Sequence, residues 1–373
     1  MSFFFELHSV SGKARTGLAR TVHGEFETPA FMPVATLAAL KGVTTGQLAE
    51  TGSEILLTNA YHLHLRPGED VVRDMGGLHR FMDWDGPLLT DSGGYQVFSL
   101  ANIRDVTDEG VSFRSHIDGR QIFIGPREAT RIQNALGADI AMAFDECPSP
   151  TAKREIVARA VRRTVEWAKV CLDAHDNEEQ TLFGIVQGGA YEDMRSDCAK
   201  QLVQLPFGGF AIGGLGIGEG TEALLQMVET TLEHLPSGKP RYLMGLGRPD
   251  DIVRCIALGV DMFDCVVPTR NARNAMLFTD DGPLRMKNAS HIRDERPVMA
   301  ECDCYTCRTV SRAYLRHLYV AGEHLAGVLG SIHNIHYYQS LVRRCRKSIE
   351  EGCFDDFLRI WLRRYNGPNS SEG

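Results

Sequence analysis

Residues 209–244 read GFAIGGLGIGEGTEALLQMVETTLEHLPSGKPRYLM, and this stretch indicates how the chain folds. Its two ends, 209–212 and 241–244, are apolar runs of strand length, and the segment between them has apolar residues at helical spacing. That stripe consists of Leu224, Met227, Val228, Thr231, Leu232 and Leu235. A strand, a covering helix and a second strand make the unit from which parallel sheets are built.

The same unit repeats along most of the chain. Eight strand-length runs occur at 30–34, 54–58, 87–90, 139–144, 182–186, 209–212, 241–244 and 260–263. A second helical stripe comprises Ile156, Val157, Ala160, Val161, Thr164, Val165, Ala168, Cys171 and Leu172. Eight apolar strands alternating with helices over roughly 250 residues predict an α/β fold, a parallel (β/α)8 TIM barrel. A doubly wound open sheet is the alternative.

Other segments do not fit this repeat. Alternating apolar and polar residues predict antiparallel hairpins at 3–27, at 111–124 and at 276–286. Helices are expected at 311–328, 334–351 and 353–365. We therefore expect a barrel domain with an N-terminal hairpin over 1–290 and a helical zinc-binding subdomain over 291–373, packed on the barrel.

Composition indicates an ordinary globular protein, because 43% of the 373 residues are hydrophobic and 24% are charged. No run reaches the roughly 18 apolar residues of a membrane span, and the first residues lack a basic signal region, so we expect a cytoplasmic protein without a membrane partner. The net charge of −8 argues against bulk binding of nucleic acid. Residues 264–373 nevertheless carry 16 basic and 13 acidic side chains, so a polyanion would bind there, although a solvated helix face explains the same run.

Three cysteines, Cys302, Cys304 and Cys307, lie within six residues. Zn²⁺ prefers four nitrogen or sulfur ligands, and a downstream histidine would complete the set. The candidates are His317, His324, His333 and His336. We choose His333, because it falls between two expected helices and its ring can reach back to the cysteine loop. Four protein ligands leave no open position, so the ion would be structural.

Polar residues follow the predicted strands, at the end where barrel enzymes place their active sites. They include Asp91 after the third strand, Asp145 after the fourth, Gln187 after the fifth and Asp264 after the eighth. A carboxylate with the amide of Gln187 and a backbone N–H complements the pairing edge of guanine. Two further aspartates would serve retaining glycosyl transfer, in which one attacks the anomeric carbon and the other moves protons.

Several long motifs resemble one known family. They are Thr90–Leu100 (TDSGGYQVFSL), Phe144–Cys147 (FDEC), Ile212–Leu215 (IGGL), Met262–Asn274 (MFDCVVPTRNARN), Glu301–Cys307 (ECDCYTC), Ser311–Leu315 (SRAYL) and Ile332–Asn334 (IHN). They closely resemble the queuine tRNA-ribosyltransferases, the bacterial tRNA-guanine transglycosylases. The likeness runs nearly from end to end, and motifs of this length in this order are highly specific.

The resemblance implies a role for each matching position. Asp264 corresponds to the nucleophile and Asp91 to the general acid/base. The base would be bound by Asp91, Ser92, Gly93, Gly94, Tyr95, Asp145, Cys147, Gln187, Gly213, Gly214, Leu215 and Met244. RNA would contact Gly245, Leu246, Gly247, Arg248, Pro249, Asp250, Asp251, Thr269, Arg270, Asn271, Ala272 and Arg273. Cys302, Cys304, Cys307 and His333 correspond to the ligands of one zinc ion per subunit, and the family forms homodimers.

The implied reaction exchanges guanine at the anticodon wobble position of the GUN tRNAs for Asp, Asn, His and Tyr. The incoming base would be 7-aminomethyl-7-deazaguanine, in queuosine biosynthesis, through a covalent aspartyl-ribosyl intermediate. Queuine itself is the alternative base, because Ala35 and the bulky segment 37–40 depart from the family pattern near the pocket.

Two other function classes remain open. His62 and His64 follow the second strand as in metal-dependent TIM-barrel hydrolases, although Gln187 and Gly213 stand where such enzymes need histidines. A non-catalytic tRNA-binding subunit would be expected to lack Asp91 or Asp264, and both are present.

Overall fold

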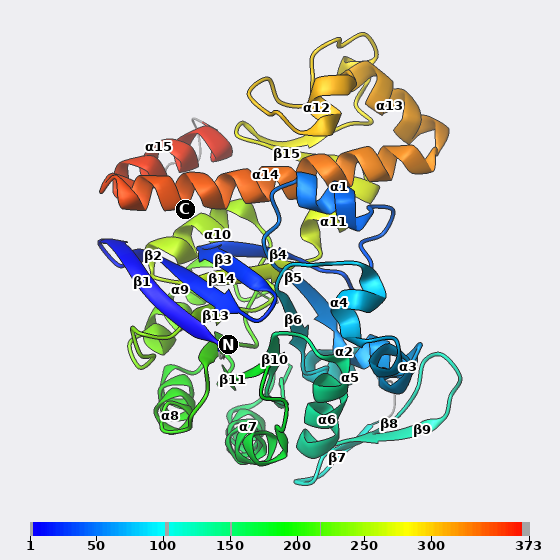
Figure 1. Cartoon of the computed structure of the whole chain (residues 1–373). Coiled ribbons are helices and arrows are strands. Elements are labelled where there is room, and N and C mark those ends of the chain that lie inside the picture. The colour runs from blue at the N-terminus through cyan, green and yellow to red at the C-terminus, as the bar shows by residue number, and fades with distance from the viewer. Residues whose placement is uncertain (1–2, 101–103, 150, 217, 368–373) are drawn as a thin grey trace.

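The computed structural model describes residues 3–100, 104–149, 151–216 and 218–367, and its centre is an eight-stranded parallel sheet (Figure 1). In chain order the strands are β4 (Ala30–Pro33), β5 (Leu56–Asn59), β6 (Leu88–Asp91), β10 (Ile140–Met142), β11 (Thr181–Val186), β12 (Gly209–Ile212), β13 (Arg241–Leu243) and β14 (Met262–Cys265). Their spatial order is β4-β14-β13-β12-β11-β10-β6-β5, and a parallel bridge between Val34 and Leu57 closes the ring. The predicted barrel is therefore confirmed, and the open sheet is excluded.

Helices connect the strands and cover the outside of the ring. They are α1 (Thr45–Glu50), α2 (Ala60–Leu65), α3 (Glu69–Asp74), α4 (Gly77–Met82), α5 (Gly94–Leu100), α6 (Pro126–Leu136), α7 (Arg154–Ala174), α8 (Glu192–Leu202), α9 (Thr221–Leu232) and α10 (Pro249–Ala257). Both predicted stripes face the core, with one exception: Ile156 is 40% exposed in the first turn of α7. Burial of apolar side chains on both sides of the strands supplies the main stabilisation of such a barrel.

The N-terminal segment forms three strands where one hairpin was expected. These are β1 (Phe4–Ser11), β2 (Ala14–Thr21) and β3 (Gly24–Thr28), which make an antiparallel sheet beside the barrel. The buried guanidinium of Arg15 donates to both carboxylate oxygens of Asp261, at 2.9 and 2.5 Å. Asp261 directly precedes β14, so this ion pair fixes the sheet to the amino-terminal end of the barrel strands.

The other two hairpins form as predicted. Strands β8 (Val111–Arg114) and β9 (Gln121–Ile124) pair around Asp118 and Gly119, and a further strand, β7 (Arg104–Val106), extends them to a three-stranded sheet. Strands β15 (Met276–Thr279) and β16 (Gly282–Arg285) pair around the Asp281-Gly282 turn.

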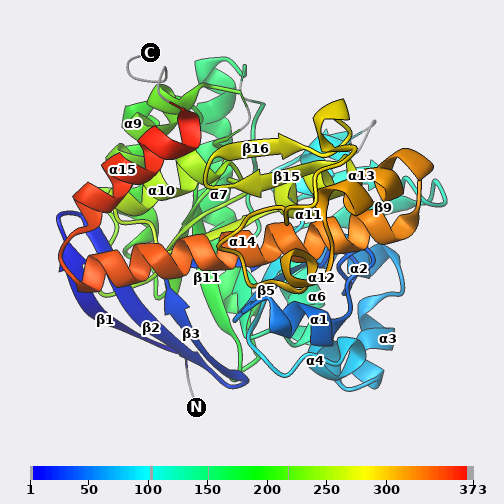
Figure 2. The same cartoon turned by 90° about the horizontal axis from the view of Figure 1, so that it is seen from above.

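The C-terminal helices differ from the prediction. They are η1 (Ala289–His291), α12 (Tyr305–Thr309), α13 (Arg312–Ala321), α14 (His324–Glu350) and α15 (Phe354–Asn366). The expected helix 311–328 is wrong, because Gly322 ends α13 in a left-handed conformation and α14 begins two residues later. The expected break before residue 334 is also wrong, since α14 continues through it for 27 residues (Figure 2).

Helix α14 connects the C-terminal elements to the barrel. It lies between the barrel and the lobe that contains α12 and α13 (Figure 1). Gln339 donates to the carbonyl of Phe31 in β4, and Arg346 donates to the carbonyls of Glu27 and Pro29. The boundary between 1–290 and 291–373 stays a prediction. Within the described residues, no helix combines the length and the hydropathy needed to cross a lipid bilayer.

Candidate active site

A cavity of about 850 Å³ opens at the carboxyl ends of the barrel strands. Both carboxylates predicted to be catalytic line it, as does every residue predicted to bind the base. These residues are Asp91, Ser92, Gly93, Gly94, Tyr95, Asp145, Cys147, Gln187, Gly213, Gly214, Leu215, Met244 and Asp264. The cavity has the size of a small-molecule site and lies where barrel enzymes carry out their chemistry.

Asp91, the last residue of β6, is buried and held by three donors. Its Oδ2 accepts from the amides of Asn59 at 2.5 Å and Gln96 at 2.6 Å, and its Oδ1 accepts from the Ala60 N–H at 3.0 Å. Burial raises the pKa of the Asp91 carboxyl to about 6, although these hydrogen bonds oppose the shift. The negative charge of Asp264 raises this pKa further. A carboxyl group that titrates near neutral pH can both take up and release a proton.

Asp264 stands in β14 and lines the same cavity. Its Oδ1 accepts from the Tyr242 hydroxyl at 2.5 Å and from the Gly245 N–H at 2.7 Å. Burial raises the pKa of Asp264, and these two hydrogen bonds oppose the shift. Among the described residues, no hydrogen bond reaches Oδ2. The carboxylate is thus oriented through one oxygen, and the other oxygen can react with a ligand.

Asp145 and Gln187 form a second buried group in the cavity lining. The Gln187 side-chain amide donates to Asp145 Oδ2 at 2.7 Å, and the Ser92 hydroxyl donates to Oδ1 at 3.4 Å. Burial raises the pKa of Asp145 to about 6. Gly94 is needed beside this carboxylate, because a Cβ at Gly94 would lie 2.5 Å from Asp145 Oδ1. Polar groups of both kinds, acceptor and donor, therefore reach the same cavity.

Three supporting residues were missed from the sequence. Asn59, Gln96 and Tyr242 orient the two catalytic candidates, and all three line the cavity. Asn59 ends β5 just as Asp91 ends β6, so its place at a strand end was an available signal. Tyr242 lies within an apolar strand, where the sequence pattern indicates only a core residue.

The predicted RNA-contacting residues fall into two segments at the mouth of the cavity. Residues 245–251 lead from β13 into α10, and those that line the cavity are Gly245, Leu246, Gly247, Arg248 and Asp251. Pro249 and Asp250 are buried in the first turn of α10. Residues 269–273 lie in α11 (Val267–Arg273), where Arg270 lines the cavity.

The members of this second segment are exposed to different degrees. Thr269 and Ala272 are buried, Asn271 is half-buried, and Arg270 and Arg273 are exposed. Arg270 and Arg273 are therefore the side chains of α11 that solvent and a large ligand can reach.

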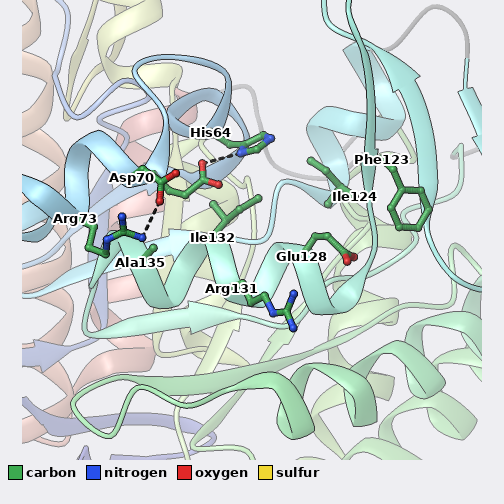
Figure 3. A pocket seen from close by; sticks show the side chains of 10 residues that line it. His64, Asp70, Arg73, Phe123, Ile124, Glu128, Arg131, Ile132 and Ala135 are labelled. Carbon is green, nitrogen blue, oxygen red and sulfur yellow. Dashed lines mark hydrogen bonds and ion pairs between the residues drawn. The ribbon is translucent and has the colours of Figure 1, made fainter.

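His62 and His64 point to different places. His62 lines the cavity, whereas His64 pairs with Glu69 at 2.7 Å in a separate pocket of about 270 Å³ (Figure 3). That pocket also contains the ion pair between Asp70 and Arg73. Neither histidine belongs to a group with metal-ligand spacing among the described residues. The hydrolase alternative has no support in this arrangement.

Cys302, Cys304, Cys307 and His333 meet in one buried cluster. The three sulfur atoms lie 3.7, 3.6 and 3.3 Å from Nδ1 of His333. Zinc–ligand bonds of about 2.3 Å to sulfur and about 2.0 Å to nitrogen give similar ligand separations in a tetrahedron. The His333 Nε2 lies 2.8 Å from the Phe278 carbonyl, so Nε2 bears the proton and Nδ1 keeps its lone pair for a metal. The four residues fit a structural metal ion.

His333 is the histidine in the cluster, as predicted, but the predicted position of His333 between two helices is wrong. His333 does not lie between two helices but within α14, and α14 packs its His333 face against the loop of Cys302 and Cys304. His336, one turn further along α14, also approaches Cys302, at 3.6 Å.

A second group with metal-ligand spacing, His23, His79 and Asp139, is better explained by hydrogen bonds. The two rings contact different oxygens of Asp139, at 2.9 and 3.0 Å. The rings are stacked 3.5 Å apart at 15°, so an ion in the plane of one ring would lie outside the plane of the other. The group fastens the β2–β3 turn and α4 to the start of β10.

Comparison with known proteins assigns the chain to a family. The family model described as queuine tRNA-ribosyltransferase matches residues 10–367. A queuine tRNA-ribosyltransferase of Moorella thermoacetica is 51% identical over 353 residues, which cover 95% of both chains. One of Staphylococcus aureus, strain JH9, is 51% identical over 94% of this chain and 93% of its own. The chain therefore belongs to the queuine tRNA-ribosyltransferase family.

Proposed function

We propose that this protein is a tRNA-guanine transglycosylase that replaces guanine at the wobble position of GUN anticodons with 7-aminomethyl-7-deazaguanine, in queuosine biosynthesis. Membership of the family supports the class of reaction, and the names of the relatives state the ribosyl transfer and the tRNA. The single observation that carries the proposal is the meeting of Asp91, Asp145, Gln187 and Asp264 in one cavity.

Base recognition is assigned to the group around Asp145. A guanine pairing edge offers a ring N–H and an exocyclic amine, which two carboxylate oxygens accept, and a carbonyl oxygen, which N–H groups bind. Asp145 supplies the acceptors. The Gly214 N–H and the Gln187 amide supply donors, and the half-exposed ring of Tyr95 stacks on the base at the mouth. The wobble base must leave its stack to enter, which costs less in a single-stranded loop than in a duplex.

Asp264 and Asp91 are assigned to the chemistry. Asp264 Oδ2 attacks C1′ of the ribose, the C1′–N9 bond breaks, and guanine takes a proton from Asp91 as it leaves. The incoming base gives its N9 proton to Asp91, attacks C1′, and releases the Asp264 carboxylate. The two displacements keep the configuration at C1′ and consume no cofactor. Water must be kept from the intermediate, because hydrolysis would leave an abasic site, and the bound base and ribose would cover the two carboxylates.

The cysteine cluster is assigned to one structural Zn²⁺ per subunit. Cys302, Cys304, Cys307 and His333 would fill all four positions, so the ion would fix local structure and take no part in the reaction. We also assign the exposed arginines of α11 and the 245–251 segment to the anticodon loop. A homodimer is the expected assembly.

The test uses tRNA that carries labelled guanine at the wobble position, incubated with unlabelled 7-aminomethyl-7-deazaguanine. Wild type is expected to release the label, and Asp264→Asn to release none. Asp281→Asn, which changes an exposed carboxyl far from the cavity lining, is the matched control and should exchange at the wild-type rate. No release by wild type would reject the reaction, and full exchange by Asp264→Asn would reject the nucleophile. Competition with queuine in the same assay decides which base is imported.

A further inference from the structure

Arg195 is a fully buried cation that the reaction above does not use. It stands in the first turn of α8, and its side chain has no solvent exposure. Burying a guanidinium is costly, and the positive end of a helix dipole adds to that cost. Its Nη1 is buried without a hydrogen-bond partner in the described part of the chain. A side chain kept at such a cost calls for a specific explanation.

The guanidinium contacts the backbone behind the base cavity. Nε donates to the Gly189 carbonyl at 2.7 Å, and Nη2 donates to the Gly213 carbonyl at 3.1 Å. Gly189 follows β11 and Gly213 follows β12, so one side chain joins two neighbouring loops. These loops carry Gln187 and Gly214, which line the cavity.

The bond to Gly213 fixes the direction of the next N–H. In a trans peptide the carbonyl of one residue and the N–H of the following residue point in opposite directions. The Gly213 oxygen points toward Arg195, which does not line the cavity, so the N–H of Gly214, which does line it, points the opposite way, toward the cavity. A cation on the carbonyl also polarises the peptide and makes that N–H a stronger donor. Gly214 has a φ of +68°, and a Cβ there would lie 2.5 Å from Gln187 Oε1, so this turn depends on glycine.

We propose that Arg195 is a positioning residue for base selection, which turns the Gly214 N–H toward the cavity so that the site accepts a purine with a carbonyl oxygen at that edge. A base with an amine at the same position would meet donor against donor and be rejected. This inference rests on the proposed function, because it assumes that the base pairs with Asp145, Gln187 and Gly214.

The test compares guanine with 2,6-diaminopurine, which carries an amine in place of the carbonyl and has no proton on the adjacent ring nitrogen; the second difference is the same for every variant at Arg195. KM and kcat are measured for the exchange of labelled guanine into tRNA. 2,6-Diaminopurine is measured as a competitive inhibitor of that exchange. Arg195→Met is expected to raise the KM for guanine about tenfold, the loss of one oriented hydrogen bond. It should change kcat less, and should leave inhibition by 2,6-diaminopurine within about threefold of wild type. Arg195→Lys keeps the charge and an N–H donor group, though not the planar fork of guanidinium, and should recover part of the discrimination.

Arg241→Met is the matched control. Arg241 is a half-buried arginine that also donates to a carbonyl, that of Leu235, but it lies at the opposite end of the barrel strands. Arg241→Met should lower the stability of the protein without changing the ratio of the inhibition constant of 2,6-diaminopurine to the KM for guanine. If Arg195→Met does not fold, the same ratio is measured for Arg195→Lys and should lie below that of wild type.

The outcomes separate the two proposals. An unchanged ratio in a folded Arg195 variant, or an equal loss for both bases, would overturn the role of Arg195. Wild type that binds neither base would overturn the proposed function itself.

Discussion

At the residue scale, the two candidate catalytic carboxylates owe their properties to neighbours that the sequence pattern does not reveal. Asp91 and Asp264 could be predicted, because a polar residue at the end of an apolar strand is informative in a barrel. Asn59 offered a signal in its place at a strand end, but its bond to Asp91 depends on the pairing of β5 with β6. The role of Tyr242 depends on the pairing of β13 with β14, and that of Gln96 on the turn from β6 into α5. Each of these three donates to one of the two carboxylates, at 2.5 to 2.6 Å.

Tyr242→Phe tests the orientation of Asp264. It removes the hydroxyl that donates to Oδ1 and leaves only the Gly245 N–H. We expect the rate of covalent ribosyl-enzyme formation to fall about tenfold, the equivalent of one hydrogen bond of about 1.4 kcal/mol. Single-turnover trapping of the adduct on tRNA measures this rate. Tyr337→Phe, whose hydroxyl donates to the Thr279 carbonyl outside the cavity lining, should leave the rate unchanged.

Activity should depend on pH near neutrality. Burial raises the pKa of Asp91 and of Asp145 to about 6, so both keep their protons to a higher pH than exposed aspartates. Asp145 must be ionised to accept the N–H groups of the base, and this form is lost as the pH falls through about 6. Asp91 must be protonated to protonate the departing guanine, and this form is lost as the pH rises through about 6. We therefore expect kcat/KM to decline on both sides of that pH, as measured by a pH–rate profile at constant ionic strength. A flat profile between pH 5 and 7.5, with the enzyme folded throughout, would contradict the proposed ionisations.

Stability should respond in the opposite direction. Because the folded-state pKa of Asp145 is raised, folding favours its protonated form, and that contribution is lost as the pH rises through about 6. Asp145→Asn removes the ionisation and can be accommodated, since the buried Gln187 Oε1 has no hydrogen-bond partner and can accept from the new amide. The Tm of this variant relative to wild type should therefore rise between pH 5 and pH 8. Thermal unfolding at both values measures it, and a constant difference would contradict the assigned pKa.

At the scale of elements, the strands were predicted closely and the C-terminal helices were not. A buried parallel strand is a short apolar run with little ambiguity, and all eight runs became strands. The sequence prediction ends one helix at 328 and begins the next at 334, with Gly330 and polar residues such as Asn334 near the break. These positions are buried by contacts from distant segments, such as Asn334 donating to the Pro268 carbonyl, so a glycine and polar residues lie inside a continuous helix.

Two glycines of α14 give a matched pair of variants. A Cβ at Gly330 would lie 2.1 Å from the Tyr319 hydroxyl, whereas a Cβ at Gly327 would meet Arg273 Cγ at an ordinary 3.4 Å. Gly330→Ala should lower the free energy of unfolding by about 1–3 kcal/mol through overpacking. Gly327→Ala should be neutral or raise it by up to about 1 kcal/mol through helix propensity. Urea denaturation compares them, and equal effects would show that the contact with Tyr319 is not limiting.

At the scale of the whole molecule, the basic C-terminal third is less available to a polyanion than its charge count indicates. Arg344 forms an ion pair with Asp280, Arg346 with Glu54, and Arg364 with Asp281. These arginines fasten α14 and α15 to the rest of the protein. The sequence reveals how many charges there are, but which of them are neutralised depends on contacts between segments far apart in the chain.

Removal of the metal should separate RNA binding from base binding. The cluster joins the loop of Cys302 and Cys304 to α14, and α14 packs against α11, which carries the exposed arginines. The base cavity is lined mostly by residues of the barrel. Cys304→Ala should abolish zinc content, lower the Tm and weaken tRNA binding, with guanine affinity changed less. Metal analysis, thermal unfolding and filter binding measure these effects. Cys353→Ala, at an exposed cysteine outside the cluster, is the control and should retain one zinc per subunit.

The order in which the barrel strands are synthesised determines when both candidate catalytic carboxylates are present in the chain. Asp91 is made early and Asp264 late, and β14, which bears Asp264, completes the circle by pairing with β4 near the start of the chain. A nascent polypeptide that has emerged only as far as β13 therefore lacks the carboxylate proposed above as the nucleophile. On that proposal, truncated products that keep only one of Asp91 and Asp264 would be unable to remove bases from tRNA.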